Sequence, residues 1–331
     1  MIGGFRVISQ PALCLILGTC TRGGAMQGRL KLGTRGSPLA LAQARKVAAA
    51  LETAQRWPAG YVQIVPITTT GDKVQDRPLA EIGGKYLWTK ELDRALLAGE
   101  VDFNVHSMKD VESVRPPEIH IASMRPRGDF RERLIGAESL DALPQGAKVG
   151  TSSPRRAAQL RSRRPDLVIV PLRGNVETRL AKVESGEIDA TLLTSAALKR
   201  LGMHDVGVAV PVEVLLPAPG QAALGLECRT DDTVTQSMLT TINNQITYQA
   251  VMAERAFTRA LGASCNSPVA ALAVLDDGEL AMRAQLFSED GSEMIQDKAR
   301  FDCGDDETPE ALARRMLEAA PPSIRSLFEK A

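Results

Sequence analysis

Apolar and polar positions alternate between strand-like and helix-like spacing along much of the chain. Short apolar runs predict strands at 62–67 and 101–105. Longer runs rich in Ala, Leu, Gln and Arg predict helices at 38–52 and 87–97. This β/α alternation is typical of a mostly parallel sheet with helices on both faces. Because such sheets bind ligands at the carboxyl ends of their strands, we expect Arg35 and Asp110 at the rim of a cleft.

The opening of this pattern occurs twice, and so does a later phrase, in the same order. The pairs are Lys31-Leu32-Gly33-Thr34 with Lys148-Val149-Gly150-Thr151, and Gly99-Glu100-Val101-Asp102 with Gly186-Glu187-Ile188-Asp189. Each opening predicts a strand, a tight turn and a helix that begins at Ser37-Pro38 or Ser153-Pro154, with Ser as the N-cap. The free N–H groups of such helix ends bind anions. We interpret the repeat as two related lobes that face each other across a cleft.

A different composition follows the Pro- and Gly-rich hinge at 216–221. The pattern predicts a helix over 248–261, a loop over 262–268, strands that turn at Asp277-Gly278 and Asp290-Gly291, and a closing helix capped by Thr308-Pro309. This is a small antiparallel α+β domain. The expected division is a leader at 1–25, lobe 1 at 26–126 and 222–243, lobe 2 at 130–216, and a third domain at 244–331.

Charge and cysteine content narrow the function classes. Lys and Arg total 40, as do Asp and Glu, so no bulk charge favours binding to nucleic acid or to a membrane surface. The five cysteines are odd in number and lack a C-x-x-C motif, which argues against a disulfide framework or a zinc site. We expect a cytoplasmic protein without a metal. Residues 1–25 resemble a signal peptide only faintly, and we interpret them as a disordered extension or as sequence ahead of a natural start at Met26.

Arginine is concentrated in the second lobe, between residues 151 and 180, where no lysine occurs. The guanidinium fork suits carboxylates and phosphates. Arg155 and Arg156 follow the Ser153 N-cap, so their side chains and the backbone amides could converge on one anion. Arg173 follows the strand predicted at 167–172, so we expect it at the rim of the cleft as well. Arg161, Arg163 and Arg164 are interpreted as a solvated helix end.

Several motifs resemble the porphobilinogen deaminase family, also called hydroxymethylbilane synthase. They cover nearly all of the chain after the leader, and they are Gly33-Thr34-Arg35-x-Ser37-Pro38, Gly83-Gly84-Lys85, His106-Ser107-Met108-Lys109-Asp110-Val111, Gly150-Thr151-Ser152-Ser153-x-Arg155-Arg156, Leu172-Arg173-Gly174-Asn175-Val176, and Glu254-Arg255-Ala256-Phe257 leading to Cys265.

This resemblance implies a transferase of tetrapyrrole biosynthesis, the route to haem and chlorophyll precursors. Such an enzyme joins four porphobilinogen units into the linear tetrapyrrole hydroxymethylbilane and releases ammonia at each condensation. Its dipyrromethane primer is held by a thioether, here to Cys265, and its product passes to a downstream cyclising enzyme. The implied fold is α/β, with two periplasmic-binding-protein-like lobes of mixed, mostly parallel sheets and a small α+β third domain. We expect a monomer.

The resemblance also implies roles for individual residues. Porphobilinogen carries acetate and propionate groups, so a growing chain accumulates carboxylates and requires fixed cations. The matching positions for cofactor and substrate binding are Arg35, Ser37, Lys85, Lys109, Thr151, Ser153, Arg155, Arg156, Arg173, Gly174 and Arg179. Asp110 matches the catalytic aspartate, whose carboxylate stabilises the cationic, azafulvene-like pyrrole that ammonia loss leaves behind.

The chain departs from the family pattern at three places. Ala263-Ser264 precedes Cys265 where Gly-Gly is usual, and Ala222 replaces a common glycine, which predicts a stiffer hinge. Trp88 stands where the family tends to show Phe, and it either stacks on a pyrrole or packs a helix. The alternative function is a two-lobed binding protein for small carboxylates without catalysis. That alternative explains the arginines, but it explains neither Asp110 in its motif nor the third domain with its cysteine.

Overall fold

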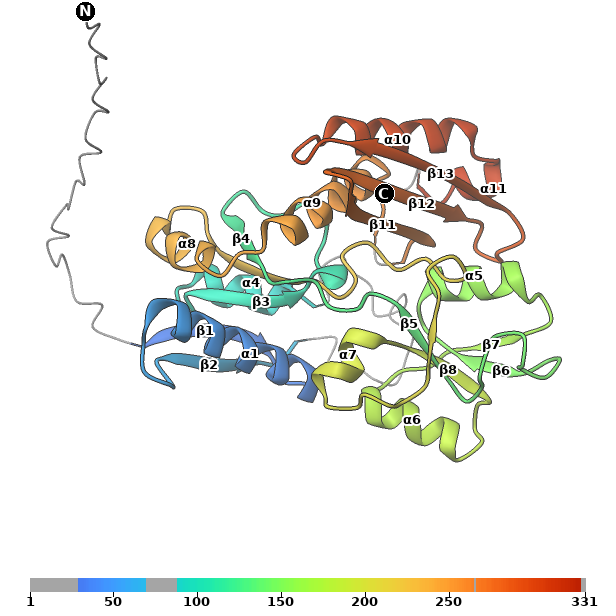
Figure 1. Cartoon of the computed structure of the whole chain (residues 1–331), viewed down its shortest axis with the longest axis horizontal. Coiled ribbons are helices and arrows are strands. Elements are labelled where there is room, and N and C mark those ends of the chain that lie inside the picture. The colour runs from blue at the N-terminus through green and yellow to red at the C-terminus, as the bar shows by residue number, and fades with distance from the viewer. Residues whose placement is uncertain (1–28, 70–87, 265, 329–331) are drawn as a thin grey trace, which may run out of the picture.

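The computed structural model describes residues 29–69, 88–264 and 266–328. They form two lobes and a third domain, which lie around a shared junction in Figure 1. Lobe 1 contains a five-stranded sheet in the order β2-β1-β3-β10-β4. Its strands are β1 (Leu30–Arg35), β2 (Val62–Ile67), β3 (Phe103–Ser107), β4 (Ile119–Met124) and β10 (Leu224–Arg229). Its helical segments are α1 (Pro38–Gln55), α4 (Lys90–Leu97), the 3-10 turn η1 (Met108–Asp110) and α8 (Thr233–Thr240).

Lobe 2 repeats this plan with the strand order β7-β6-β8-β5-β9. Its strands are β5 (Glu132–Ile135), β6 (Lys148–Gly150), β7 (Val168–Val170), β8 (Ala190–Thr194) and β9 (Val208–Val210), and its helices are α5 (Pro154–Arg163), α6 (Val176–Glu184) and α7 (Ser195–Arg200). In each lobe the fourth strand of the order, β10 or β5, runs antiparallel to both neighbours, while the first three are parallel. Four strands therefore run one way and one runs the other, which confirms the mixed, mostly parallel sheets.

The repeated phrases of the sequence contact each other in the same way in both lobes. The Lys31 N–H donates to the Asp102 carboxylate at 2.7 Å, and the Asp102 N–H donates back to the Lys31 carbonyl at 2.9 Å. In lobe 2 the same two bonds join Lys148 and Asp189, at 2.6 and 2.9 Å. Each aspartate thus ties the start of the second strand in the sheet order, β1 or β6, to the segment that leads into the third, β3 or β8.

The predicted helix starts are confirmed in both lobes. Ser37 caps α1 by accepting a bond from the Ala40 N–H, and Ser153 caps α5 by accepting one from the Arg156 N–H. Helices cover both faces of the lobe 1 sheet, because α1 shares a core with Val62 whereas α4 shares one with Val65. Some boundaries differ from the predicted positions: α1 extends to Gln55, α4 begins at Lys90 and β3 begins at Phe103.

The third domain is a three-stranded antiparallel sheet packed against two long helices. Its elements are α9 (Gln245–Ala260), β11 (Val269–Asp276), β12 (Glu279–Phe287), β13 (Met294–Phe301), α10 (Glu307–Ala319) and α11 (Pro322–Arg325). The predicted turn at Asp277-Gly278 is confirmed, with φ angles of 50° and 86°. The predicted cap of α10 is wrong by two residues, because Asp306 is the N-cap and Thr308 lies in the first turn.

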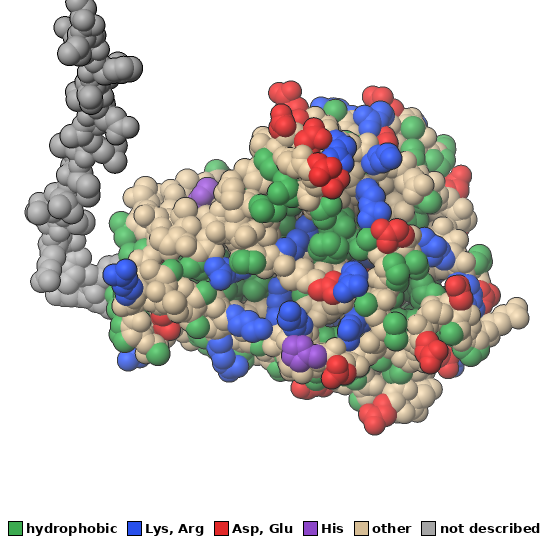
Figure 2. Space-filling view, in the orientation of Figure 1, with side chains coloured by type: hydrophobic (Ala, Val, Ile, Leu, Met, Phe, Trp, Pro, Cys, Tyr) green, Lys and Arg blue, Asp and Glu red, His purple; other side chains and the backbone are tan. Residues whose placement is uncertain are grey.

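The two faces of β11 are both buried. Val269, Ala271 and Ala273 join the core of the third domain, while Ala270 and Leu272 pack against Leu216 of the hinge. Figure 2 shows Asp and Glu side chains interspersed with Lys and Arg over the visible face, as the equal totals of the two classes predict. Within the described ranges, no helix combines the length and the apolar character that a bilayer crossing requires.

Candidate active site

Asp110 lies on η1, directly after β3, and its side chain is half-buried. The turn is anchored by Met108, which is buried and whose N–H donates to the Ala223 carbonyl at 3.1 Å. Glycine is required opposite it: a Cβ on Gly220 would lie 2.9 Å from the Met108 carbonyl carbon, and one on Gly225 would collide with the Met108 sulfur. The structure thus presents Asp110 on a turn held firmly against the hinge and β10.

Lys109 brings the two lobes into electrostatic contact. The residue keeps solvent contact, yet protein surrounds it closely enough for desolvation to lower the pKa of its ammonium group. Asp110 opposes this shift, and so does Glu132 of lobe 2, whereas the charges of Arg156 and Arg155 add to it. A lowered pKa of this origin marks a cation that an added anion would stabilise.

Arg35 ends β1 and stacks on an aromatic ring. Its guanidinium carbon lies 3.9 Å from the centroid of the Trp88 ring. Such a cation–π contact uses the face of the guanidinium group, whereas its N–H groups point outward in the plane. The sequence leaves two roles open for Trp88, and in the structure this side chain supports Arg35.

A second group of cations lies where β7 leads into α6. Gly174 has a φ of +105°, and a Cβ on it would lie 2.8 Å from Thr178, so only glycine fits. Its carbonyl accepts a bond from the Arg179 Nε at 3.0 Å. Burial is the main cause that lowers the pKa of Arg179 to about 10, and the neighbouring charges of Arg156 and Arg173 contribute to the same shift. Cations that repel one another in this way favour an anionic ligand between them.

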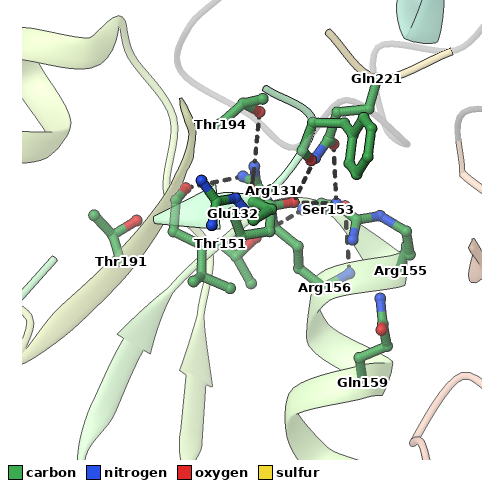
Figure 3. A network of polar contacts seen from close by, with 12 residues as sticks. Arg131, Glu132, Thr151, Ser153, Arg155, Arg156, Gln159, Thr191, Thr194 and Gln221 are labelled. Carbon is green, nitrogen blue, oxygen red and sulfur yellow. Dashed lines mark hydrogen bonds and ion pairs between the residues drawn. The ribbon is translucent and has the colours of Figure 1, made fainter. Parts of the chain in front are cut away.

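Arg155 and Arg156 face a protein carboxylate in lobe 2. Figure 3 shows both side chains extending from α5 towards Glu132 of β5. The nearest contacts to the Glu132 carboxylate are 2.6 Å for each arginine, and all three side chains are buried. Arg155 also donates to the Leu216 carbonyl at 2.8 Å, and Arg156 to the Leu192 carbonyl at 2.9 Å. The pair thus joins α5, β5, β8 and the hinge.

Comparison with known proteins decides the family. Residues 30–237 match the family model described as the porphobilinogen deaminase dipyromethane cofactor binding domain, and residues 248–320 match the porphobilinogen deaminase C-terminal domain. The chain belongs to the porphobilinogen deaminase family. It is 52% identical over 306 residues to the porphobilinogen deaminase of Sphingopyxis alaskensis, covering 90% of this chain and 96% of that protein. The Paracoccus denitrificans enzyme is 48% identical, with 81% of this chain and 87% of that protein covered.

Among solved structures, the periplasmic VFT2 domain of Bordetella pertussis BvgS is similar at 17% identity, with a TM-score of 0.38 for the double mutant. That match covers 69% of this chain and 90% of the BvgS chain.

Glu132, the carboxylate that Arg155 and Arg156 share in lobe 2, is not identified by the sequence motifs. It lies in the run Arg131-Glu132-Arg133-Leu134, where it shares a strand face with the buried Leu134. Burial alone would raise the pKa of Glu132, but the charges and hydrogen bonds of Arg156 and Arg155 hold it well below its usual range. A carboxylate at an inward position of a strand is the signal that could have identified it.

The hydroxyl groups expected at the site take part in local structure. The Thr151 Oγ1 accepts a bond from the Ser153 N–H at 3.2 Å, and the hydroxyls of Ser37 and Ser153 are the helix caps described above. Lys85, Cys265 and the leader at 1–25 lie outside the described residues. Thr151 and Ser153 therefore shape the turn that leads into α5.

One cluster in lobe 1 has the composition of a metal site. Asp93, His106 and Glu227 bring ligand atoms together within 4.8 Å. The guanidinium group of Arg115 already lies between the two carboxylates, 2.6 Å from Asp93 and 2.8 Å from Glu227. Positive charge is therefore supplied by an arginine, and the cluster forms a buried ion-pair network.

Proposed function

We propose that this chain joins four porphobilinogen units head to tail into hydroxymethylbilane and releases ammonia at each step, on a dipyrromethane primer held by a thioether to Cys265. The chain is an enzyme of the deaminase family, whose larger matched domain is the one that binds the dipyrromethane cofactor. The observation that carries the proposal is the electrostatics around Asp110. Lys109 and Arg179 both have lowered pKa values because burial and neighbouring cations disfavour their charge.

Those cations fit the carboxylates of a dipyrromethane. Each pyrrole carries an acetate and a propionate, and Lys109, Arg173 and Arg179 gather positive charge where the lobes approach each other. Arg35 adds a guanidinium group whose orientation is fixed by stacking on the Trp88 ring. When bound, the cofactor supplies the free pyrrole position to which each new unit is joined. The full proposed binding set is Arg35, Ser37, Lys85, Lys109, Thr151, Ser153, Arg155, Arg156, Arg173, Gly174 and Arg179.

Within this set Arg155 and Arg156 act differently from the others. Their guanidinium groups are engaged by Glu132, so direct binding requires a ligand carboxylate to exchange with Glu132 or to approach the Arg155 Nε, which is buried without a hydrogen-bond partner in the described structure. Without such exchange they contribute net positive charge behind Lys109 and Arg179, because two arginines share one carboxylate.

The proposed role of Asp110 is electrostatic. Loss of ammonia leaves positive charge on the pyrrole of the reacting unit, and a carboxylate fixed beside the ring nitrogen stabilises that charge as it develops. Its turn is held in place by Met108, so little reorganisation is needed during the reaction. A fixed carboxylate among cations suits a substrate that carries several negative groups and becomes cationic at one atom.

Intact-mass measurement tests the proposal most directly. Purified active protein should carry the mass of two linked pyrrole units, mapped by peptide analysis to Cys265, and Cys265→Ala should lack it. Cys228, which is buried in β10, and the exposed Cys303 serve as internal controls. An unmodified mass in protein that releases ammonia from porphobilinogen would contradict the covalent primer. Porphobilinogen binding without ammonia release would instead support the non-catalytic binding protein.

We further propose that the enzyme is a cytoplasmic monomer whose product passes to a cyclising enzyme. The proposed domain boundaries are 26–126 with 222–243, 130–216 and 244–331. They agree with the membership of the three sheets and with the two matched family segments.

A further inference from the structure

Helix α9 of the third domain holds the segment that follows Asp110. Arg255, in the last part of this helix, donates from its Nη1 to the Val111 carbonyl at 3.2 Å and from its Nη2 to the Glu112 carbonyl at 2.6 Å. These are the two residues directly after Asp110. Arg255 is 5% exposed, so the contacts are made inside the protein.

The preceding residue of α9 holds the opposite side of the same turn. The Glu254 carboxylate accepts a bond from the Gly220 N–H at 2.6 Å. Gly220 is the hinge residue that packs against the backbone of Met108 and Lys109. Two successive residues of one helix therefore fix the position of η1, Glu254 through the hinge and Arg255 through the downstream backbone.

Burial disfavours the charge of Arg255 more than the neighbouring carboxylates favour it. Arg255 donates to two neutral carbonyl groups, and burial is the main cause that lowers the pKa of its guanidinium group to about 10. Arg259, one turn further along α9, is by contrast partly exposed and donates to the Glu310 carboxylate at 2.8 Å. Placing a guanidinium group inside the protein costs free energy, and here its hydrogen bonds serve to fix two carbonyl groups.

The segment that Arg255 holds is also fixed by the ion-pair network of lobe 1. The Glu112 carboxylate accepts bonds from the Thr89 hydroxyl at 3.1 Å and from the Arg115 Nη1 at 3.1 Å. The Val111 N–H closes the turn by donating to the Met108 carbonyl at 3.2 Å. Movement of the backbone at 111–112 would therefore be transmitted to Asp110, since the turn is short and its upstream side is fixed.

We propose that Arg255 is a positioning residue for the reaction: it sets the place of the Asp110 carboxylate from the third domain, whose α9 also leads into the loop that contains Cys265. The inference rests on the proposed function, since it assigns the effect to Asp110.

The test uses the holoenzyme, with the cofactor load of every variant verified by intact mass. Arg255→Lys keeps the charge but cannot donate to both carbonyls in the same fork, and we expect kcat to fall roughly 10- to 10²-fold, because small displacements of reacting groups have effects of that size. KM for porphobilinogen should change by less than about 2-fold, since the proposed binding cations remain in place. Arg259→Lys is the matched control and should keep kcat unchanged.

A double-mutant cycle separates positioning from a general structural role. If Arg255 acts through Asp110, Arg255→Lys should reduce the residual rate of Asp110→Asn by no more than about 2-fold, far less than in the native background. Equal reductions in both backgrounds would overturn the inference while leaving the proposed function intact. A lower melting temperature with normal kcat per folded molecule would overturn it too. Near-normal turnover by Asp110→Asn alone would instead remove the proposed role of Asp110, and the inference with it.

Discussion

The Glu132 carboxylate of lobe 2 receives two hydrogen bonds from one guanidinium group, from the Nε and Nη2 of Arg156 at 3.0 and 2.6 Å. Arg155 donates to the same carboxylate at 2.6 Å. Glu132 is fully buried, and the two arginines are nearly so. One anion therefore compensates two cations inside the protein, and its removal would take away the carboxylate that pairs with both.

We predict that Glu132→Gln lowers the free energy of unfolding by about 3–5 kcal/mol, the usual cost of breaking a buried ion pair from one side. Chemical denaturation followed by circular dichroism measures this change. Asp129→Asn is the control. Asp129 lies three residues before Glu132 and pairs with Arg131 on the surface, where such pairs contribute about 0–1 kcal/mol. Similar losses in the two variants would show that the buried network stabilises the fold no more than a surface pair.

The parts of the fold that depend on neighbouring residues could be predicted from the sequence. Ser37 and Ser153 cap their helices by accepting a hydrogen bond from the backbone N–H three residues later, so the interaction involves only neighbouring residues. The repeated Gly-Glu-x-Asp phrase also pointed correctly to related lobes, and Asp102 and Asp189 make the same contacts in each. Such features can be recognised in the sequence because the residues that interact are close together in the chain or because the same pattern occurs twice.

The electrostatic organisation of the site could not be predicted in the same way. Arg156 and Glu132 come from different elements, and only their folding together shows that the arginine faces a protein carboxylate. Arg35 and Trp88 likewise meet only once β1 and the segment before α4 are packed. A motif of arginines predicts affinity for anions, but it cannot distinguish an internal carboxylate from one on a ligand.

Acid should destabilise the protein through Glu227. Burial would raise the pKa of this carboxyl group, but His106 and Arg115 outweigh that effect and lower it from 4.5 to about 2. A lowered carboxyl pKa contributes stability that is complete above the unfolded-state value and is lost as the pH falls towards the folded-state value. We therefore expect a loss on the order of 3 kcal/mol between about pH 5 and pH 2, at 1.36 kcal/mol per unit.

Urea denaturation across that range of pH measures this loss. Glu227→Gln should be less stable at neutral pH and should show a flatter dependence on pH. Glu187→Gln is the control, since Glu187 lies on the surface beside Lys182. A native-like pH slope in Glu227→Gln would mean that other carboxyl groups account for the acid sensitivity.

Trp88 should affect substrate binding through Arg35. Replacing its ring by Leu removes the cation–π contact, which is worth about 0.5–2 kcal/mol, and frees the guanidinium group to adopt other orientations. We expect kcat/KM for porphobilinogen to fall by roughly 2- to 30-fold in Trp88→Leu and by less in Trp88→Phe. Trp57→Leu is the control, because Trp57 packs on Tyr61 in lobe 1 and its loss should affect stability alone. An unchanged kcat/KM in Trp88→Leu would separate Trp88 from the binding site.

Ala222, which directly follows the hinge, is strained, and relieving that strain should stabilise the protein. Its φ is +69°, a left-handed conformation that costs an L-residue about 1–2 kcal/mol relative to glycine. The conformation is maintained because its carbonyl accepts bonds from the Arg200 Nη2 at 2.6 Å and from the Gly128 N–H at 3.3 Å.

Ala222→Gly should therefore raise the free energy of unfolding by about 0.5–1 kcal/mol, since the strain relieved exceeds the entropy that glycine adds to the unfolded chain. Ala223→Gly is the matched control: this neighbour is also buried, but it lacks a positive φ, so the substitution should lower stability by roughly 1 kcal/mol. Denaturant titration of the two variants gives opposite signs if the backbone conformation is the cause. A loss of stability in both would mean that the lost methyl contacts outweigh any strain at Ala222.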